Sequence, residues 1–256
     1  MDVVILCGGR GTRLAEKTSV MPKPLVPIGD RPILWHIMKM YSHYGYKRFV
    51  LPLGYMGHEI KRFFVEYPWI SGDFELDMHS VSVPKPREDW SVALVDTGVD
   101  SKTQKRLHLV KEHIKTDRFM LTYGDGVADI DIGDLVRRHE YLKKTYGVMG
   151  TVTLHTPKSK FGVVDIEKDL ATAFREKPDA DKFVNIGFMV LEKGVFDHMD
   201  GSDVMLETSL LPKLAAEGRI GFYHHQNFWG CMDTYGDYMH LNEMWKNERP
   251  WKVWKD

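Results

Sequence analysis

The stretch VVILCGGRGTRL, from Val3 to Leu14, joins an apolar run to a glycine-rich turn and two arginines. The apolar run predicts a buried strand, and the glycines that follow allow the backbone to approach a ligand closely. Successive backbone N–H groups in such a turn can surround phosphate oxygens, and the guanidinium fork of an arginine matches phosphate geometry. The stretch therefore predicts a strand that ends in a phosphate-binding loop.

The spacing of this loop excludes two common phosphate sites. The dinucleotide fingerprint G-x-G-x-x-G requires a third glycine where the chain has Leu14, and Asp30 precedes a helix instead of ending a strand. A P-loop requires a lysine directly after its last glycine, but Gly11 is followed by Thr12 and Arg13. An NAD-dependent oxidoreductase is therefore disfavoured, and an ordinary tight turn is the alternative to a phosphate site.

The composition is that of a globular protein with a hydrophobic core: 256 residues, of which 43% are hydrophobic and 28% charged. The net charge of −1 predicts no attraction to nucleic acid or membranes, and no segment approaches the ~20 apolar residues of a membrane span. Neither Cys7 nor Cys231 lies in a CxxC pair, and we see no signal peptide. We expect a cytoplasmic protein, with a disulfide between the two cysteines as the alternative to free thiols.

Apolar runs alternate with amphipathic segments, and no long linker divides the chain. Strands are expected at residues 3–6, 49–53, 90–95, 119–123, 148–154, 163–166 and 187–191, and helices at 32–44, 57–64, 132–144, 207–217 and 235–245. This alternation predicts an α/β fold: a single Rossmann-like domain over residues 1–256, with a mixed, mainly parallel sheet flanked by helices.

Ligands of such sheets bind at the carboxyl ends of the strands. The glycine loop after Leu6 and the turn at Asp125, which follows Tyr123, should therefore lie on the same edge. Between them in sequence comes Met21-Pro22-Lys23-Pro24, in which two prolines stiffen the backbone around one lysine. Taken alone, Lys23 could equally be a solvated loop residue.

G-G-x-G-T-R-L followed by P-K-P closely resembles the signature of the sugar-phosphate nucleotidylyltransferases. The resemblance is strongest to the glucose-1-phosphate cytidylyltransferase group, and it extends over nearly the whole chain. Two positions depart from the pattern, because many members have lysine at Met21 and many have alanine at Cys7. The matching blocks are PILWHIMKMYSHYGYKRFV, LVDTG, TYGDGVADI, KFGVVDI, FREKP, NIGFMVL, FWGCMDT and RPWKVW.

This resemblance implies the nucleotide-diphospho-sugar transferase fold, a homo-oligomer, and a magnesium-dependent reaction of CTP with glucose 1-phosphate. The sugar phosphate would attack the α-phosphate in line, giving CDP-glucose and pyrophosphate. Arg13 and Lys23 would be catalytic: the former on the β- and γ-phosphates, the latter between the α-phosphate and the sugar phosphate. Both would also bind the nucleotide, together with Leu6, Cys7, Gly8, Gly9, Arg10, Gly11, Thr12, Thr103, Arg106, Tyr123 and Gly124.

The resemblance also implies a metal site and a sugar site. Asp125 and Asp233 match the aspartates that bind Mg²⁺, although a turn residue and a helix N-cap are their ordinary alternatives. The segment 97–106, which carries Thr103 and Arg106, would contact the base, with a disordered surface loop as the alternative. The sugar phosphate would contact Glu176, Lys177, Asn185 and Gly187.

Several functional alternatives are left open. The same chemistry could use dTTP or UTP, or another sugar 1-phosphate such as a heptose phosphate. A non-catalytic nucleotide-sugar-binding regulatory protein is disfavoured because it would not need both metal carboxylates. The aromatic C-terminal segment could form an exposed patch or fold back onto the domain; it contains Trp245, Trp251 and Trp254.

Overall fold

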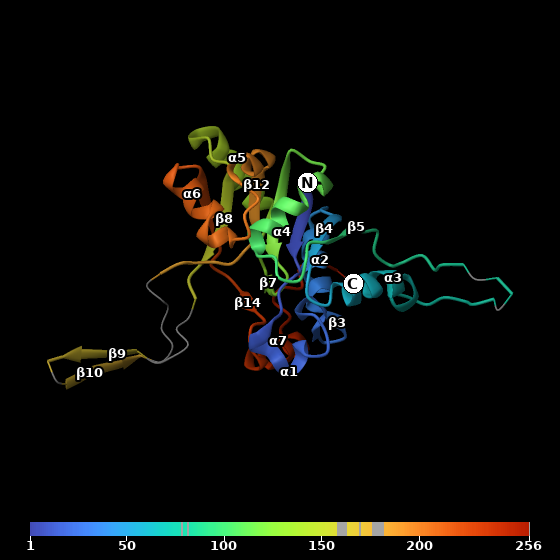
Figure 1. The fold of residues 1–256 in the computed structure, drawn as a ribbon. Coiled ribbons are helices and arrows are strands. Elements are labelled where there is room, and N and C mark those ends of the chain that lie inside the picture. Colours follow the sequence, from blue (N-terminus) through green and yellow to red (C-terminus); the bar gives the residue numbers. More distant parts are fainter. Residues whose placement is uncertain (78, 81, 158–162, 169, 176–181, 256) are drawn as a thin grey trace.

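The computed structural model describes residues 1–77, 79–80, 82–157, 163–168, 170–175 and 182–255. Its centre is an eight-stranded sheet in the order β11-β8-β12-β6-β1-β4-β5, with β13 paired to β8 (Figure 1). The strands of this sheet are β1 (Asp2–Leu6), β4 (Arg48–Leu53), β5 (Ser91–Asp96), β6 (Arg118–Tyr123), β8 (Gly150–His155), β11 (Val184–Asn185), β12 (Met189–Glu192) and β13 (Ile220–His224).

Six strands of this sheet run in one direction, and β11 and β12 run in the other. The expected mixed, mainly parallel sheet is therefore confirmed. Three further strand pairs lie outside it: β2 (Pro27–Ile28) with β3 (Arg31–Pro32), β7 (Gly126–Ala128) with β14 (Trp229–Cys231), and β9 (Val163–Glu167) with β10 (Leu170–Arg175).

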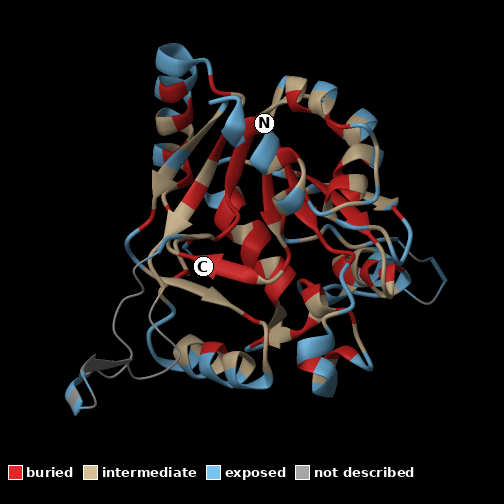
Figure 2. Cartoon of the chain, turned by 60° about the vertical axis from the view of Figure 1, so that its left-hand side comes forward, coloured by how far each residue is buried: buried red, intermediate tan, exposed pale blue. Residues whose placement is uncertain are grey.

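Both faces of the sheet are covered, as the side chains of β1 show. Val3 and Ile5 point into one hydrophobic core, which also contains Leu34, Leu135 and Leu241 from three of the helices. Val4 and Leu6 point into a second core, formed with side chains of α4 and α6. This alternation follows from the two-residue period of a strand. Figure 2 shows the buried residues concentrated on the strands and on the inner sides of the helices.

The helices are α1 (Ala15–Thr18), α2 (Ile33–His43), α3 (Gly57–Ile70), α4 (Thr103–Leu109), α5 (Ile132–Tyr146), α6 (Leu210–Ala216) and α7 (Tyr235–Asn247). Asp131 is the N-cap of α5, because its side chain accepts a hydrogen bond from the backbone N–H of Asp134. Among the described residues, no helix combines the length and the apolar character that crossing a membrane requires.

The structure corrects several expected boundaries. The segment 97–106 is not a loop throughout: from Thr103 it is helical, because Leu107 anchors α4 in the second core. The helix expected at 207–217 is a 3₁₀ turn, Leu206–Thr208, followed by α6. The strand expected at 163–166 exists as β9 but pairs with β10 instead of joining the central sheet. The strand expected at 187–191 is β12 and begins at Met189, because Gly187 and Phe188 have positive φ angles and a left-handed backbone conformation.

The aromatic C-terminal segment folds back onto its own chain. Trp251 is fully buried, and its ring stacks on Phe228 with centroids 5.5 Å apart. The indole N–H donates to Nδ1 of His36 at 3.3 Å, and Nε2 of that histidine lies 3.0 Å from the carbonyl oxygen of Ile28. Burial lowers the pKa of His36 to about 4, so the neutral ring accepts from Trp251 and donates to Ile28.

We expect Trp251→Ala to lower the free energy of unfolding by about 3–5 kcal/mol, because it removes a fully buried aromatic side chain and leaves a cavity. Urea unfolding measures this loss. Tyr146→Ala is the control, since Tyr146 is 65% exposed and its truncation should change stability by less than about 0.5 kcal/mol. Equal losses for the two variants would contradict the packing described here.

Candidate active site

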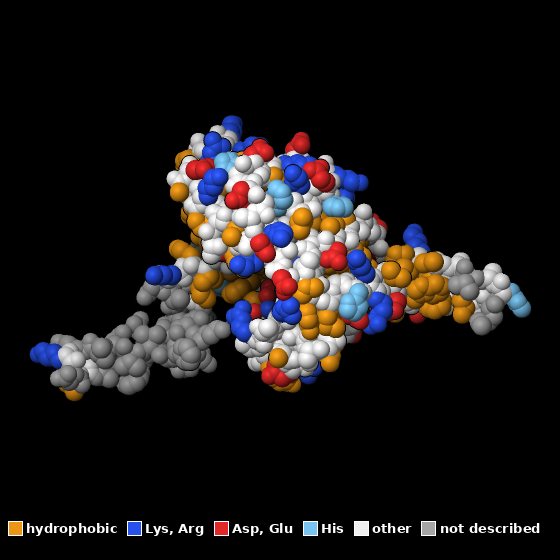
Figure 3. Space-filling view, viewed as in Figure 1, with side chains coloured by type: hydrophobic (Ala, Val, Ile, Leu, Met, Phe, Trp, Pro, Cys, Tyr) orange, Lys and Arg blue, Asp and Glu red, His pale blue; other side chains and the backbone are white. Residues whose placement is uncertain are grey.

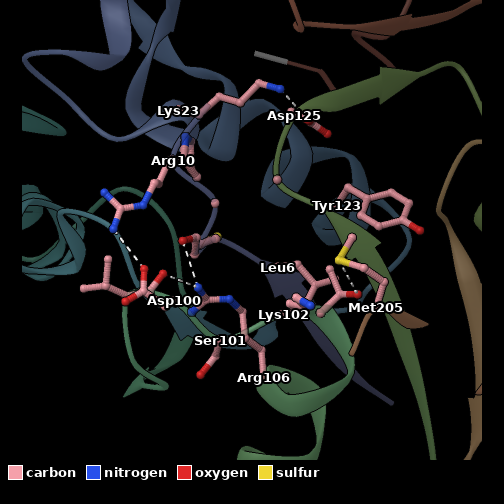
Figure 4. Close-up of a pocket in the computed structure, with 17 residues that line it drawn as sticks. Leu6, Arg10, Lys23, Asp100, Ser101, Lys102, Arg106, Tyr123, Asp125 and Met205 are labelled. Atoms are coloured by element: carbon pink, nitrogen blue, oxygen red, sulfur yellow. Dashed lines mark hydrogen bonds and ion pairs between the residues drawn. The ribbon is translucent and has the colours of Figure 1, made fainter. Parts of the chain in front are cut away.

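The glycine loop and the turn at Asp125 leave the sheet at the same edge. β1 and β6 are parallel neighbours in which Leu6 pairs with Tyr123, so the prediction from strand ends is confirmed. A pocket of about 360 Å³ opens between these ends (Figure 4). The residues predicted to bind the nucleotide that line it are Leu6, Cys7, Gly8, Gly9, Arg10, Lys23, Thr103, Arg106, Tyr123 and Gly124.

Lys23 forms the electrostatic centre of the site. Its Nζ donates to Oδ2 of Asp125 at 2.6 Å and to Oδ1 of Asp233 at 2.7 Å. The other oxygen of Asp233 lies 2.9 Å from Arg13, whose side chain is 73% exposed. Burial by itself lowers the pKa of Lys23, but the charges and hydrogen bonds of the two carboxylates outweigh burial and raise it. The ammonium group therefore stays charged between them.

Local backbone geometry fixes both sides of this cluster. Lys23 begins a 3₁₀ turn whose preceding residue, Pro22, is extended at φ −69° and ψ 145°. On the opposite side, Thr234 is the N-cap of α7 and forms a capping box with Asp237. The alternative that Asp233 is the N-cap is therefore wrong, and its carboxylate is available to the two cations.

The chain also brings the two aspartates together through their backbones. The N–H of Met232 donates to the carbonyl of Asp125 at 2.8 Å, next to the pairing of β7 with β14. Asp125, Asp233 and Cys231 each offer a possible metal ligand, and these atoms lie within 4.8 Å of one another. Two carboxylates suit a hard cation such as Mg²⁺, which usually takes one or two together with phosphate oxygens. Burial raises the pKa of Cys231, so its sulfur is a protonated thiol and a poor magnesium ligand.

A second cavity, of about 800 Å³, is also lined by Asp233, together with Cys231, Trp229 and His155. Asp125 and Lys23 line the first pocket instead. Because Lys23 bonds to both aspartates, the cluster stands where the two cavities approach each other. An arrangement of this kind can present one cation to groups entering from either side.

Arg106 is hydrogen-bonded to the backbone of the glycine loop. It is only 4% exposed, and its guanidinium donates to four carbonyl oxygens, those of Gly8 (3.0 Å), Leu53 (3.0 Å), Gly98 (2.8 Å) and Val99 (3.0 Å). A planar five-donor group suits this convergence of acceptors. The contacts tie the glycine loop to the segment after β5, while the predicted contact of Arg106 with the nucleotide stays a prediction.

The other predicted residues of the nucleotide and sugar sites are not among those that line the first pocket, and two of them lie beyond the described chain. Gly11 adopts φ 63°, and Thr12 and Arg13 start a 3₁₀ turn at the end of the glycine loop. Asn185 lies beside Tyr123, to whose hydroxyl its amide donates at 3.4 Å. Gly187 donates its N–H to the side chain of Asn185 at 3.1 Å. Glu176 and Lys177 fall outside the described residues.

Sequence reasoning did not single out several residues of the site. Asp100 pairs with Arg10 at 2.9 Å across the pocket mouth (Figure 4), and Glu207 accepts a hydrogen bond from the hydroxyl of Tyr123. Asp100 lies within the segment 97–106, which the sequence predicts to contact the base. Glu207 lies in none of the motifs that resemble the family. The further lining residues missed in the same way are Pro24, Val99, Ser101, Lys102 and Met205.

Comparison with known proteins agrees with this geometry. A family model described as nucleotidyl transferase matches residues 2–248. The chain belongs to the nucleotidyl transferase family. It is 42% identical to a probable glucose-1-phosphate cytidylyltransferase of Bacillus subtilis (strain 168), covering 99% of this chain and 100% of the relative. It is 43% identical to the glucose-1-phosphate cytidylyltransferase of Salmonella typhi over the full length of both proteins.

Solved structures share the fold. A putative glucose-1-phosphate thymidylyltransferase from Bacillus anthracis superposes with a TM-score of 0.71 at 18% identity, covering 96% of each chain. A UDP-glucose pyrophosphorylase superposes with a TM-score of 0.66 at 15% identity, covering 97% of this chain and 99% of the other. These likenesses confirm the expected nucleotide-diphospho-sugar transferase fold.

We expect Gly8→Ala to destabilise the ligand-free protein by about 1–3 kcal/mol, the usual cost of overpacking. A Cβ atom on Gly8 would lie 2.1 Å from Cζ of Arg106, so the guanidinium would have to leave its carbonyl partners. Gly9→Ala is the matched control, because a Cβ there would meet no described atom within 4 Å. Thermal unfolding of both variants measures the difference, and equal midpoints would contradict the proposed support by Arg106.

Proposed function

We infer that this protein transfers a cytidylyl group from CTP to glucose 1-phosphate, giving CDP-glucose and pyrophosphate. The observation that carries this inference is the identity of 42–43%, over the full length, to relatives named as glucose-1-phosphate cytidylyltransferases. The bond from Lys23, which lines one cavity, to Asp233, which lines the other, supports it, because the reaction must bring two phosphate-bearing substrates to one point. In-line attack needs positioning and charge neutralisation, and no covalent intermediate.

The residues of the glycine loop would divide this work between the phosphates of CTP. Backbone N–H groups from Gly8 to Thr12 would surround the triphosphate, and Arg13 would hold the β- and γ-phosphates that leave. Lys23 would exchange its carboxylate partners for the α-phosphate and the incoming sugar phosphate. A compact ammonium on a flexible stem suits such an exchange, because it can change partners with a small movement.

Asp125 and Asp233 would hold the metal, and Mg²⁺ is the ion that their hard oxygen donors fit best. When bound there, the ion would supply positive charge to phosphate oxygens. Both carboxylates are paired with Lys23 in the structure, at 2.6 and 2.7 Å. The ammonium and the metal would thus compete for the same oxygens until phosphates draw Lys23 away.

The remaining parts of the proposal concern the sugar site, the assembly and the compartment. Asn185 and Gly187 would contact the sugar phosphate together with Glu176 and Lys177. We propose one catalytic domain, in the cytoplasm, where the free thiols of both cysteines would be stable. A homo-oligomer is supported by apolar side chains exposed on α3 and the extension after it, on the right of Figure 3: Val65, Ile70, Phe74, Leu76 and Val83.

Substrate choice is tested by pyrophosphate release with glucose 1-phosphate, Mg²⁺ and each of CTP, dTTP and UTP. We expect CTP to give the highest kcat/KM. Replacing glucose 1-phosphate with mannose 1-phosphate or galactose 1-phosphate tests the sugar in the same assay. A higher kcat/KM with dTTP or UTP would overturn the base assignment but not the reaction class. Binding of CTP without turnover under any of these conditions would favour the regulatory protein instead.

We expect Lys23→Met to bind Mn²⁺ at least about tenfold more tightly than the wild type in the absence of nucleotide, because it removes a cation that competes at close range. Isothermal titration with MnCl₂ measures the affinity. The same variant should lose turnover by roughly 10²-fold or more, since an electrostatic contact to the reacting phosphates is lost.

Lys144→Met controls for net charge, because Lys144 is an exposed residue of α5, a helix that contributes no side chain to the cluster. Lys23→Gln keeps a hydrogen-bond donor beside the carboxylates and serves if the methionine variant does not fold. Unchanged or weaker Mn²⁺ binding by folded Lys23 variants would show that ammonium and metal do not compete.

A further inference from the structure

A run of hydrogen bonds links four segments that are distant in sequence. The N–H of Gly187 donates to Oδ1 of Asn185 at 3.1 Å, and Nδ2 of Asn185 donates to the hydroxyl of Tyr123 at 3.4 Å. The Tyr123 hydroxyl in turn donates to Oε1 of Glu207. The second carboxylate oxygen of Glu207 accepts from the hydroxyl of Thr103 at 3.3 Å. The network thus runs from the predicted sugar residues to the helix that carries a predicted nucleotide residue.

The chemistry of the donors and acceptors fixes the direction of each hydrogen bond from Gly187 to Glu207. An ionised carboxylate only accepts hydrogen bonds, and a phenol has a single hydrogen to donate. Because Tyr123 gives that hydrogen to Glu207, its oxygen can only accept from Asn185. The Gly187 N–H, a fixed donor, occupies the amide oxygen at the other end. Both ends therefore select the same orientation of the Asn185 amide, and its second N–H has no partner among the described residues.

The contact between the Tyr123 hydroxyl and the Glu207 carboxylate is partly buried. Glu207 itself lies in a 3₁₀ turn next to Leu206, which is fully buried. The backbone N–H of Leu206 donates to the Thr103 hydroxyl at 2.8 Å, so this turn is fastened to the start of α4.

We propose that Glu207 is a positioning residue for the sugar 1-phosphate: acting through Tyr123, it orients the Asn185 amide so that an N–H faces the substrate. The ligand class follows from the chemistry, because phosphate oxygens only accept hydrogen bonds and an amide turned by 180° would present its carbonyl oxygen to them. The proposal rests on the proposed function in one respect, namely the place of Asn185 in the sugar-phosphate site.

The test is Glu207→Gln, which keeps the shape of the side chain and an oxygen for Thr103. The new amide can also donate to Tyr123, which allows the phenol to turn its hydrogen toward Asn185. We expect the KM for glucose 1-phosphate to rise about tenfold, the scale of one hydrogen bond to a charged group, with less than about a twofold change for CTP. Tyr123→Phe should act in the same direction, and the double variant should add little, because both changes break one network.

Glu112→Gln is the matched control, since Glu112 is 84% exposed and lies in a different 3₁₀ turn; its KM values should equal those of the wild type. Equal increases of both KM values in Glu207→Gln, or a lower unfolding temperature with unchanged KM values, would show a purely structural role and overturn the proposal. Direct titration of glucose 1-phosphate by calorimetry distinguishes failure of the positioning role of Glu207 from failure of the proposed reaction. A wild type that binds this ligand about tenfold more tightly than Glu207→Gln supports the positioning role even if no triphosphate gives turnover.

Discussion

One ammonium group holds together the part of the molecule where chemistry can occur. Lys23 bonds to Asp125, which is 102 residues away in sequence, and to Asp233, which is 210 residues away. Without this cation, two carboxylates would face each other in a partly buried site, where like charges repel more strongly than in water. The strand order, the two prolines around Lys23 and the capping box of α7 all serve to bring these three side chains together.

This constraint also bears on the proposed binding of phosphates at the site. A cation removed from water must be paired, or its burial costs several kcal/mol. Lys23 meets that requirement with the carboxylates of Asp125 and Asp233, which phosphate oxygens of the same charge would replace in the proposed reaction. Arg106 also fastens the backbone of the glycine loop through the carbonyl of Gly8, a bond that uses none of the N–H donors of the loop. Donors that are already in place need little rearrangement when a negatively charged phosphate binds.

The sequence predicted the parts of this arrangement that depend on local pattern. Buried strands and their carboxyl ends could be located, so the loop after Leu6 and the turn at Asp125 were correctly expected to share an edge. The helical start of α4 was missed because buried polar residues, Gln104 and Arg106, gave the segment the appearance of a loop. Glu207 was missed for a related reason: its partners come from β6 and α4, and no spacing along the chain encodes contacts between distant elements. The single-domain organisation and the roles of individual site residues stay predictions.

The position of Glu207 bears on how the two substrates are selected. The base would be met by the segment from Thr97 to Arg106, and the sugar phosphate by the region of Asn185 and Gly187. Glu207 contacts both sides, through Thr103 and through Tyr123. A movement of α4 on nucleotide binding would therefore be transmitted to the Tyr123 hydroxyl, because the carboxylate of Glu207 accepts hydrogen bonds from both Thr103 on α4 and Tyr123. In the proposed network, base recognition and sugar recognition would thus meet at Glu207, a partly buried acid that need not touch either substrate.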